Sequence, residues 1–126
     1  RDNWNGVWIN RLSSGTWTGW HFGGGNAGRD PQVAAGLGQL YISVIDPWGG
    51  VYYRRFLEGT GNNWQNWVAA QGTLDDAAPA VLGSEFYLAG RDLSNNLWWF
   101  RVGAPSAWSF VGQSSLVPGP LATTPR

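Results

Sequence analysis

The apolar positions of this chain fall in short runs, and turn-forming residues separate the runs. The most β-prone run covers residues 40–45, and Pro and Gly residues within 47–50 divide it from a second apolar run at 51–56. A shorter run at 32–35 comes before them, and another at 64–69 follows. β-branched and aromatic residues dominate these runs, and no 3.6-residue period competes. The pattern predicts four antiparallel strands joined by short loops.

A longer pattern repeats three times, with copies that begin at Asp2, Asp46 and Asp92. Each copy contains a short turn, an apolar–aromatic pair, an Arg and then a Trp. The pairs are Val7-Trp8, Val51-Tyr52 and Leu97-Trp98, the Arg residues are Arg11, Arg55 and Arg101, and the Trp residues are Trp17, Trp64 and Trp108. Self-similarity of about 40–50 residues with several short strands per copy is typical of the blades of a β-propeller.

The ends of the chain do not match a whole number of blades. The third copy repeats the strand order of the second, with runs at 79–82, 86–89, 97–101 and 108–111. The first copy begins at the turn before a third strand, and residues 121–124 offer a possible first strand in the tail at 117–126. We therefore expect one all-β partial propeller over residues 1–126, with about two and two-thirds blades. Unpaired edges predict completion by further copies of the chain or by the rest of a longer polypeptide.

Composition narrows the possible functions. The chain has 10 Trp, 4 Tyr, 5 Phe and 19 Gly, and its 8 basic residues balance its 8 acidic ones. Sparse, balanced charge argues against a nucleic-acid partner, which requires a basic surface. No apolar run is long enough to predict a membrane span.

Catalytic signals are weak. There is no Cys, and His21 is the single His, so neither metal-ligand spacing nor a nucleophile–His arrangement is present. Asp75 and Asp76 are adjacent and would point apart, whereas glycosidases need two facing carboxylates. We expect a structural role for His21, no catalytic residue, no metal and no cofactor.

The order of the motifs resembles a known family. Pro31-x-Val33, Leu40-Tyr41 followed by Asp46, the segment from Gly50 to Arg55, and Trp64-x-x-Trp67 resemble the blades of the seven-bladed bacterial propeller lectins of the PLL-like group, which are similar in plan to the fucose-lectin and tectonin propellers. The resemblance implies non-catalytic, multivalent sugar sites in clefts between neighbouring blades. It implies glycan partners, with fucosylated or O-methylated sugars among the candidates.

Aromatic residues and arginines are the candidate ligand contacts. Trp8, Tyr52 and Trp98 could stack on the apolar face of a sugar, or could fill the contact between blades. Trp4 and Trp48 occupy matching positions in polar turns, where a ring either covers a neighbour or meets a partner. Arg11, Arg55 and Arg101 could donate to hydroxyl groups, or could bond a carbonyl or carboxylate within a blade. Glu85, and Gln39 at the matching position of the preceding unit, are the expected polar neighbours. The repeated Asp residues are expected to form the turns.

Two alternatives to a lectin stay open at this level. Blade aromatics suit a scaffold for protein–protein interaction equally well. A fragment of a glycoside-processing propeller is the third reading, and the missing carboxylate pairs count against it.

Overall fold

The computed structural model describes residues 1–36, 38–57, 64–103 and 107–113, and this part of the chain forms ten strands and no helix. The predicted all-β class is confirmed. The strands are β1 (Val7–Ser13), β2 (Thr16–Gly24), β3 (Gln32–Gly36), β4 (Gln39–Ile45), β5 (Gly50–Leu57), β6 (Val68–Thr73), β7 (Asp76–Leu82), β8 (Glu85–Arg91), β9 (Asn96–Arg101) and β10 (Ser109–Gln113).

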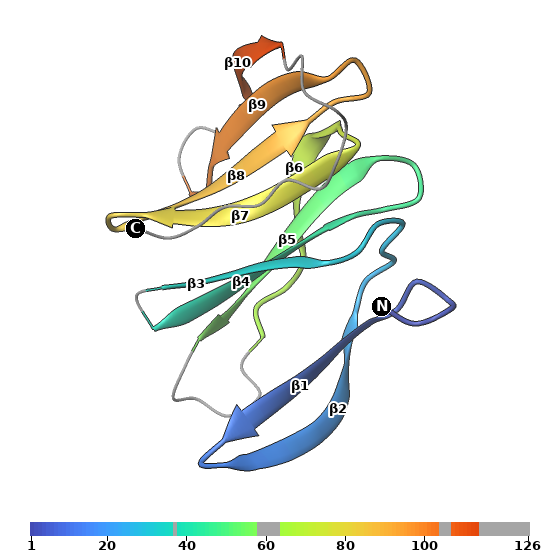
Figure 1. The fold of residues 1–126 in the computed structure, drawn as a ribbon, viewed down its shortest axis with the longest axis vertical. Helices are drawn as coiled ribbons and strands as arrows, with labels where there is room; N and C mark the ends of the chain where they lie inside the picture. Colours follow the sequence, from blue (N-terminus) through green and yellow to red (C-terminus); the bar gives the residue numbers. More distant parts are fainter. Residues whose placement is uncertain (37, 58–63, 104–106, 114–126) are drawn as a thin grey trace.

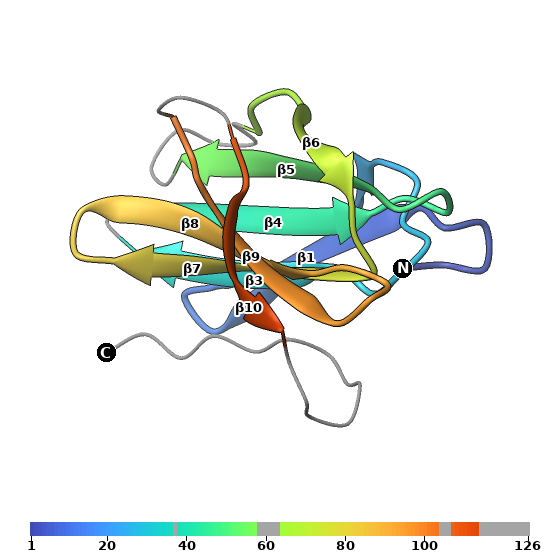
Figure 2. The ribbon, with the colours of Figure 1, turned by 90° about the horizontal axis from the view of Figure 1, so that it is seen from above.

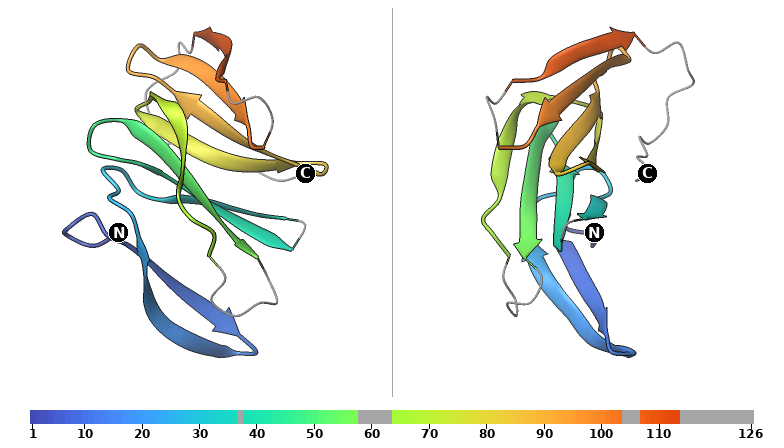
Figure 3. Two further views of the ribbon diagram at one scale, coloured as in Figure 1. Left: turned by 180° about the vertical axis from the view of Figure 1, so that it is seen from behind. Right: turned by 90° about the vertical axis from the view of Figure 1, so that its left-hand side faces the viewer.

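The strands form three antiparallel sheets that follow one another along the long axis of the molecule (Figure 1). The first sheet contains β1 and β2, the middle sheet has the order β3-β4-β5-β6, and the third has the order β7-β8-β9-β10. A view along the long axis shows the sheets overlying one another (Figure 2). Two further side views show the same succession of twisted sheets as Figure 1 (Figure 3). Strand β7 packs against β3 and β4, so the third sheet meets the middle one through their first strands.

Strand boundaries follow the apolar runs except at one place. The run at 64–69 was expected to form a strand, but β6 begins at Val68. Trp64 instead makes an isolated bridge with Phe56, and the backbone N–H of Gln65 donates to the carbonyl of Arg55. The pairing between β5 and β6 also has a register shift. The expected strand at 121–124, like the whole tail at 117–126, lies outside the described residues.

Two hydrophobic clusters fill the spaces between the sheets. The cluster between the middle and third sheets contains Ile45, Val51, Ala70, Leu74, Ala77, Leu88 and Phe100. The cluster between the first and middle sheets contains Val7, Ala27, Ile42 and Val44, with Tyr52, Trp64 and Trp67 packed against it. Ser43 adds a buried polar contact, since its hydroxyl donates to the carbonyl of Ala77 between the middle and third sheets. Apolar packing is therefore the main contact between neighbouring sheets.

A Trp directly ahead of β6 and another directly ahead of β10 each join their sheet to the sheet before it. Trp108 donates from Nε1 to the carbonyl oxygens of Ala70 and Gln71, at 3.0 and 2.7 Å, and its ring lies against Gly72. The ring of Trp67 lies against Gly25 of the preceding segment, but its buried Nε1 has no hydrogen-bond partner among the described residues. Both glycines have positive φ, 85° and 89°, and a Cβ there would come within 3.3 and 3.2 Å of the rings. The inter-sheet contact is therefore repeated, as the sequence is.

Candidate functional site

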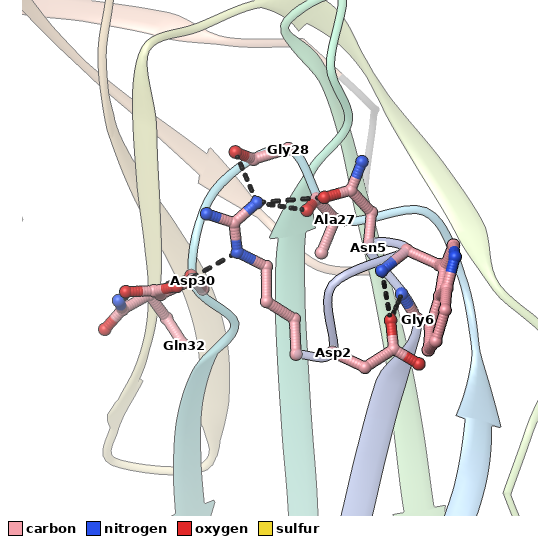
Figure 4. A network of polar contacts seen from close by, with 9 residues as sticks. Asp2, Asn5, Gly6, Ala27, Gly28, Asp30 and Gln32 are labelled. Atoms are coloured by element: carbon pink, nitrogen blue, oxygen red, sulfur yellow. Dashed lines mark hydrogen bonds and ion pairs between the residues drawn. The ribbon is translucent and has the colours of Figure 1, made fainter.

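The three repeated Asp residues form equivalent turns on the same side of the molecule (Figure 1). In each turn, one carboxylate oxygen accepts two backbone N–H groups, from the residues two and four positions later. Figure 4 shows this arrangement for Asp2, whose Oδ1 accepts from Gly6 at 2.7 Å. The fourth residue of every turn has positive φ, namely Asn5, Gly49 and Asn95. The expected turn-forming role of the Asp residues is confirmed.

An Arg stabilises the first and third turns from outside. Arg1 donates to the side chain of Asn5 and to the carbonyls of Ala27 and Gly28 (Figure 4). Arg91 donates to the side chain of Asn95 and forms an ion pair with Asp75. The middle turn has Ile45 and Gly49 at the matching positions. The middle turn therefore has no Arg–Asn side-chain hydrogen bond of the kind that the other two turns form.

The candidate rings Trp8 and Trp98 are bound to their turns. Trp8 donates from Nε1 to Oδ2 of Asp2 at 2.6 Å, and Trp98 donates in the same way to Asp92 at 3.0 Å. The Trp8 hydrogen bond lowers the pKa of Asp2. The pKa of Asp92 falls from 3.8 to about 2, first through the Asn96 side-chain amide and then through Trp98 and two backbone N–H groups. The ionised carboxylates of Asp2 and Asp92 are therefore part of these two turns.

Acid is expected to weaken the third turn. The carboxylate of Asp92 titrates near 3.8 when unfolded and near about 2 when folded. Its stabilising effect is therefore fully present above about pH 4 and is lost as the pH falls through about 2. Thermal unfolding midpoints of the wild type and of Asp92→Asn, measured from pH 6 to pH 2, should differ most at the higher pH values and converge in acid. A difference that stays constant across this range would contradict the role of the charge.

The repeated Arg residues have three different surroundings. Arg101 forms a two-pronged ion pair with Glu85, with nitrogen–oxygen distances of 3.0 and 2.7 Å. The pair lowers the pKa of Glu85. Arg55 lies 3.5 Å from the amide oxygen of Gln39 at the matching position. Glu85 and Gln39, the expected polar neighbours, thus contact Arg101 and Arg55 within the sheets, whereas Arg11 lines an open cleft.

That cleft, here called the Arg11 cleft, lies between the first and middle sheets and has a volume of about 400 Å³. Its polar lining includes Arg11, Thr18 and His21, and its apolar wall includes Phe56 and Trp64, whose rings lie 4.9 Å apart. Ile9, Asn10 and Leu40 complete the lining. The cleft thus places flat aromatic surface opposite hydrogen-bonding side chains from another sheet.

A second cleft of about 500 Å³ lies between the middle and third sheets. Its lining from the middle sheet includes Tyr53, Arg55 and Val68, which occupy the repeat positions of Ile9, Arg11 and His21. The third sheet contributes Val102 at the repeat position of Phe56. The two clefts are therefore built from the same repeat positions, with different residues.

The repeated candidate ring and the repeated Arg of one unit do not share a cleft. Tyr52 and Arg55 are three residues apart on β5, which pairs regularly with β4, so their side chains lie on opposite faces of the sheet. Tyr52 packs toward the first sheet, whereas Arg55 lines the cleft toward the third. Trp98 and Arg101 have the same relation on β9. The ring beside Arg11 is consequently Trp64 of the next unit.

The turn residues Trp4 and Trp48 are strongly exposed, at 85% and 78%. Trp48 lines a third hollow of about 300 Å³ together with Tyr52 and Trp67, whereas Trp4 lines none of the hollows described above. The two residues occupy equivalent turn positions but have different surroundings.

Arg54 is a structural residue that the sequence analysis did not single out. Its guanidinium lies over the rings of Trp64 and Trp67, 5.1 and 5.2 Å from their centroids. It donates to the carbonyl oxygens of Gln65 and Gly23. Burial lowers its pKa. Arg54 thus fixes the aromatic wall of the Arg11 cleft.

Within the described ranges, no group of three or more His, Asp or Glu residues is arranged to hold a metal ion. The same part of the chain contains no helix long and apolar enough to cross a membrane. A scan against models of protein families gave no match, and a search of curated proteins gave none either.

Proposed function

We propose that this chain is a non-catalytic glycan-binding protein and that its sheets are blades of a partial β-propeller. The observation that carries the proposal is the Arg11 cleft, where Trp64 and Phe56 face Arg11, Thr18 and His21. Sugars present an apolar C–H face and a rim of hydroxyl groups. Such a ligand can stack on a ring and accept hydrogen bonds from an Arg at the same time.

The lining of the Arg11 cleft also favours binding over hydrolysis. It includes no Asp or Glu among the described residues, so it offers no pair of facing carboxylates. The nearby positive charge of Arg11 is balanced by no acidic side chain in the lining. The cleft is therefore suited to neutral or weakly anionic sugars.

The second cleft supports a multivalent mode of binding. Tyr53 and Arg55 occupy the repeat positions of Ile9 and Arg11, so a sugar could meet an Arg in each cleft. A single sugar buries little area and exchanges water hydrogen bonds for protein ones, so affinity at each site should be weak. Repeated sites on one surface would raise the avidity for clustered glycans.

Replacing Arg11 with Ala is expected to weaken sugar binding by roughly tenfold, because a charged hydrogen bond to the ligand is lost. Arg11 is exposed, so the fold should tolerate the change. A glycan array that includes fucosylated and O-methylated sugars would identify a ligand, and calorimetric titration would then compare the variant with the wild type.

Arg101→Ala is the matched control. Arg101 has the same repeat position but is paired with Glu85 and lines neither cleft. It should leave the affinity unchanged. A wild type that binds nothing on the array would refute glycan binding. An Arg11→Ala variant with wild-type affinity would show that the sugar does not bind in the Arg11 cleft.

We further propose that the partial propeller is completed by additional copies of the chain or by further parts of a longer one. Trp20, Trp67 and Trp108 occupy equivalent positions in the repeat. Each lies directly before a residue that pairs with the neighbouring strand, namely His21 with Ile9, Val68 with Tyr53 and Ser109 with Trp99. Trp67 and Trp108 pack against a preceding sheet, whereas Trp20 is 68% exposed. Among the described residues, no preceding sheet covers Trp20, which instead borders an open hollow with Val33 and Leu40 of the middle sheet. This exposed aromatic surface is also the observation that favours a scaffold function.

A further inference from the structure

A separate hollow lies beside the middle turn. It has a volume of about 300 Å³ and is lined by Gly25, Asn26, Val44, Asp46, Trp48, Tyr52 and Trp67. It shares no lining residue with the Arg11 cleft. Three aromatic side chains and one carboxylate thus surround a space that lies outside the two proposed glycan sites.

Asp46 has a carboxylate oxygen that its counterparts do not have available. Its Oδ1 accepts from the backbone N–H groups of Trp48 and Gly50, as in the other turns. Its Oδ2 accepts no hydrogen bond within the described ranges. In the other turns, the same oxygen accepts from the indoles of Trp8 and Trp98.

Two residue differences open this oxygen. Tyr52 stands where the other units have Trp, so no indole N–H is present. Gly50 stands where the third unit has Asn96, whose side-chain amide donates to Asp92 at 2.9 Å. A Cβ on Gly50 would lie 2.7 Å from Oδ2 of Asp46 and 3.2 Å from Cε2 of Tyr52. The free oxygen and the Tyr52 ring therefore border the same small space.

The rings around this space differ in exposure and in partners. Tyr52 packs against the cluster between the first and middle sheets, so one wall is fixed. Trp67 is held by Gly25 and carries the Arg54 guanidinium near its ring. Trp48 is exposed on the turn and is free to cover a ligand. Trp48 and Tyr52 are therefore the rings that a ligand can use.

We propose that this hollow binds an alkylated ammonium group, such as a trimethylammonium head. A cation with apolar substituents gains from aromatic faces and from the carboxylate together. A purely apolar ligand would cover the open oxygen of Asp46 without pairing it, which is unfavourable. A strongly hydrated inorganic cation would gain little from Trp48 and Tyr52.

Titration with tetramethylammonium chloride, at ionic strength held constant with potassium chloride, tests the proposal. Indole proton shifts of the wild type should change and saturate below about 50 mM. Trp48→Ala should weaken binding roughly tenfold, because one ring is removed. Tyr52→Trp should weaken it at least as much, because its indole can occupy Oδ2 of Asp46 as Trp8 and Trp98 do in their turns.

Trp4→Ala is the matched control, since Trp4 has the same turn position but lies beside an Asp whose second oxygen is occupied. It should leave the affinity unchanged. The proposal is overturned if the wild type shows no saturable shift, or if Tyr52→Trp binds tetramethylammonium as the wild type does. A second titration compares choline with its neutral isostere 3,3-dimethylbutan-1-ol, and equal affinities for the two would also overturn the proposal. None of these results would bear on glycan binding in the Arg11 cleft.

Discussion

Purified at micromolar concentration, the 126-residue chain is expected to form assemblies of two or more copies. The first sheet exposes Trp20 and Phe22, and the repeat counterpart of Trp20, Trp67, packs against a preceding sheet. At the other end of the described residues, the third sheet exposes Trp99 and Val111. Inside the molecule, Trp67 and Trp108 cover the equivalent positions. Burying the free faces against each other would repeat a contact that already exists twice.

Light scattering coupled to size-exclusion chromatography measures this association. Trp20→Ser should weaken it at least tenfold, because an aromatic residue central to the contact is removed. Trp4→Ser provides the comparison, because Trp4 is at least as exposed but lies on the turn ahead of β1 and not on β2. A folded wild-type monomer that persists over this concentration range would contradict the assembly proposal.

Replacing Leu88 with Ala is expected to lower the free energy of unfolding by about 3 kcal/mol. Leu88 is fully buried in the cluster between the middle and third sheets, where it lies with Val51 and Phe100. Its truncation would remove apolar contacts and leave a cavity, for which costs of about 2–5 kcal/mol are typical. Chemical denaturation followed by tryptophan fluorescence would measure the change.

The control substitution is Leu93→Ala, which makes the same chemical change on an exposed turn. Its effect should be within about 0.5 kcal/mol. Equal losses for the two variants would show that the two units do not depend on the cluster that joins them.

The local pattern was sufficient to predict much of the fold. The runs at 40–45 and 51–56 correspond to β4 and β5, and the repeated Asp turns adopt one geometry because Asp, a left-handed residue and two backbone donors recur together. The run at 64–69 was misplaced because Trp64 and Gln65 bond to β5 ahead of β6, through a short bridge. Apolar content alone does not reveal such an offset in pairing.

The candidate sites were harder to predict, because clefts join residues of different units. Strand alternation already separates Tyr52 from Arg55, which the repeat motif presents as neighbours. The pairing of Arg11 with Trp64 depends on how two sheets pack, and the position of Arg54 depends on Trp64 and Trp67 meeting. The motif Trp64-x-x-Trp67 was visible in the sequence, but nothing local indicated that an Arg would lie over both rings.

The self-contained Asp turn has a consequence for how such a chain can diversify. The Asp carboxylate of each turn forms its hydrogen bonds within seven consecutive residues, whereas neighbouring sheets meet chiefly through apolar faces. Duplication of a unit would copy its turn intact, and one copy could then exchange Trp for Tyr, or Asn for Gly, while Asp still holds the backbone. The middle turn has this composition, with Tyr52 and Gly50 around Asp46. Repetition thus frees a carboxylate in one copy to acquire a new role while the others retain the original one.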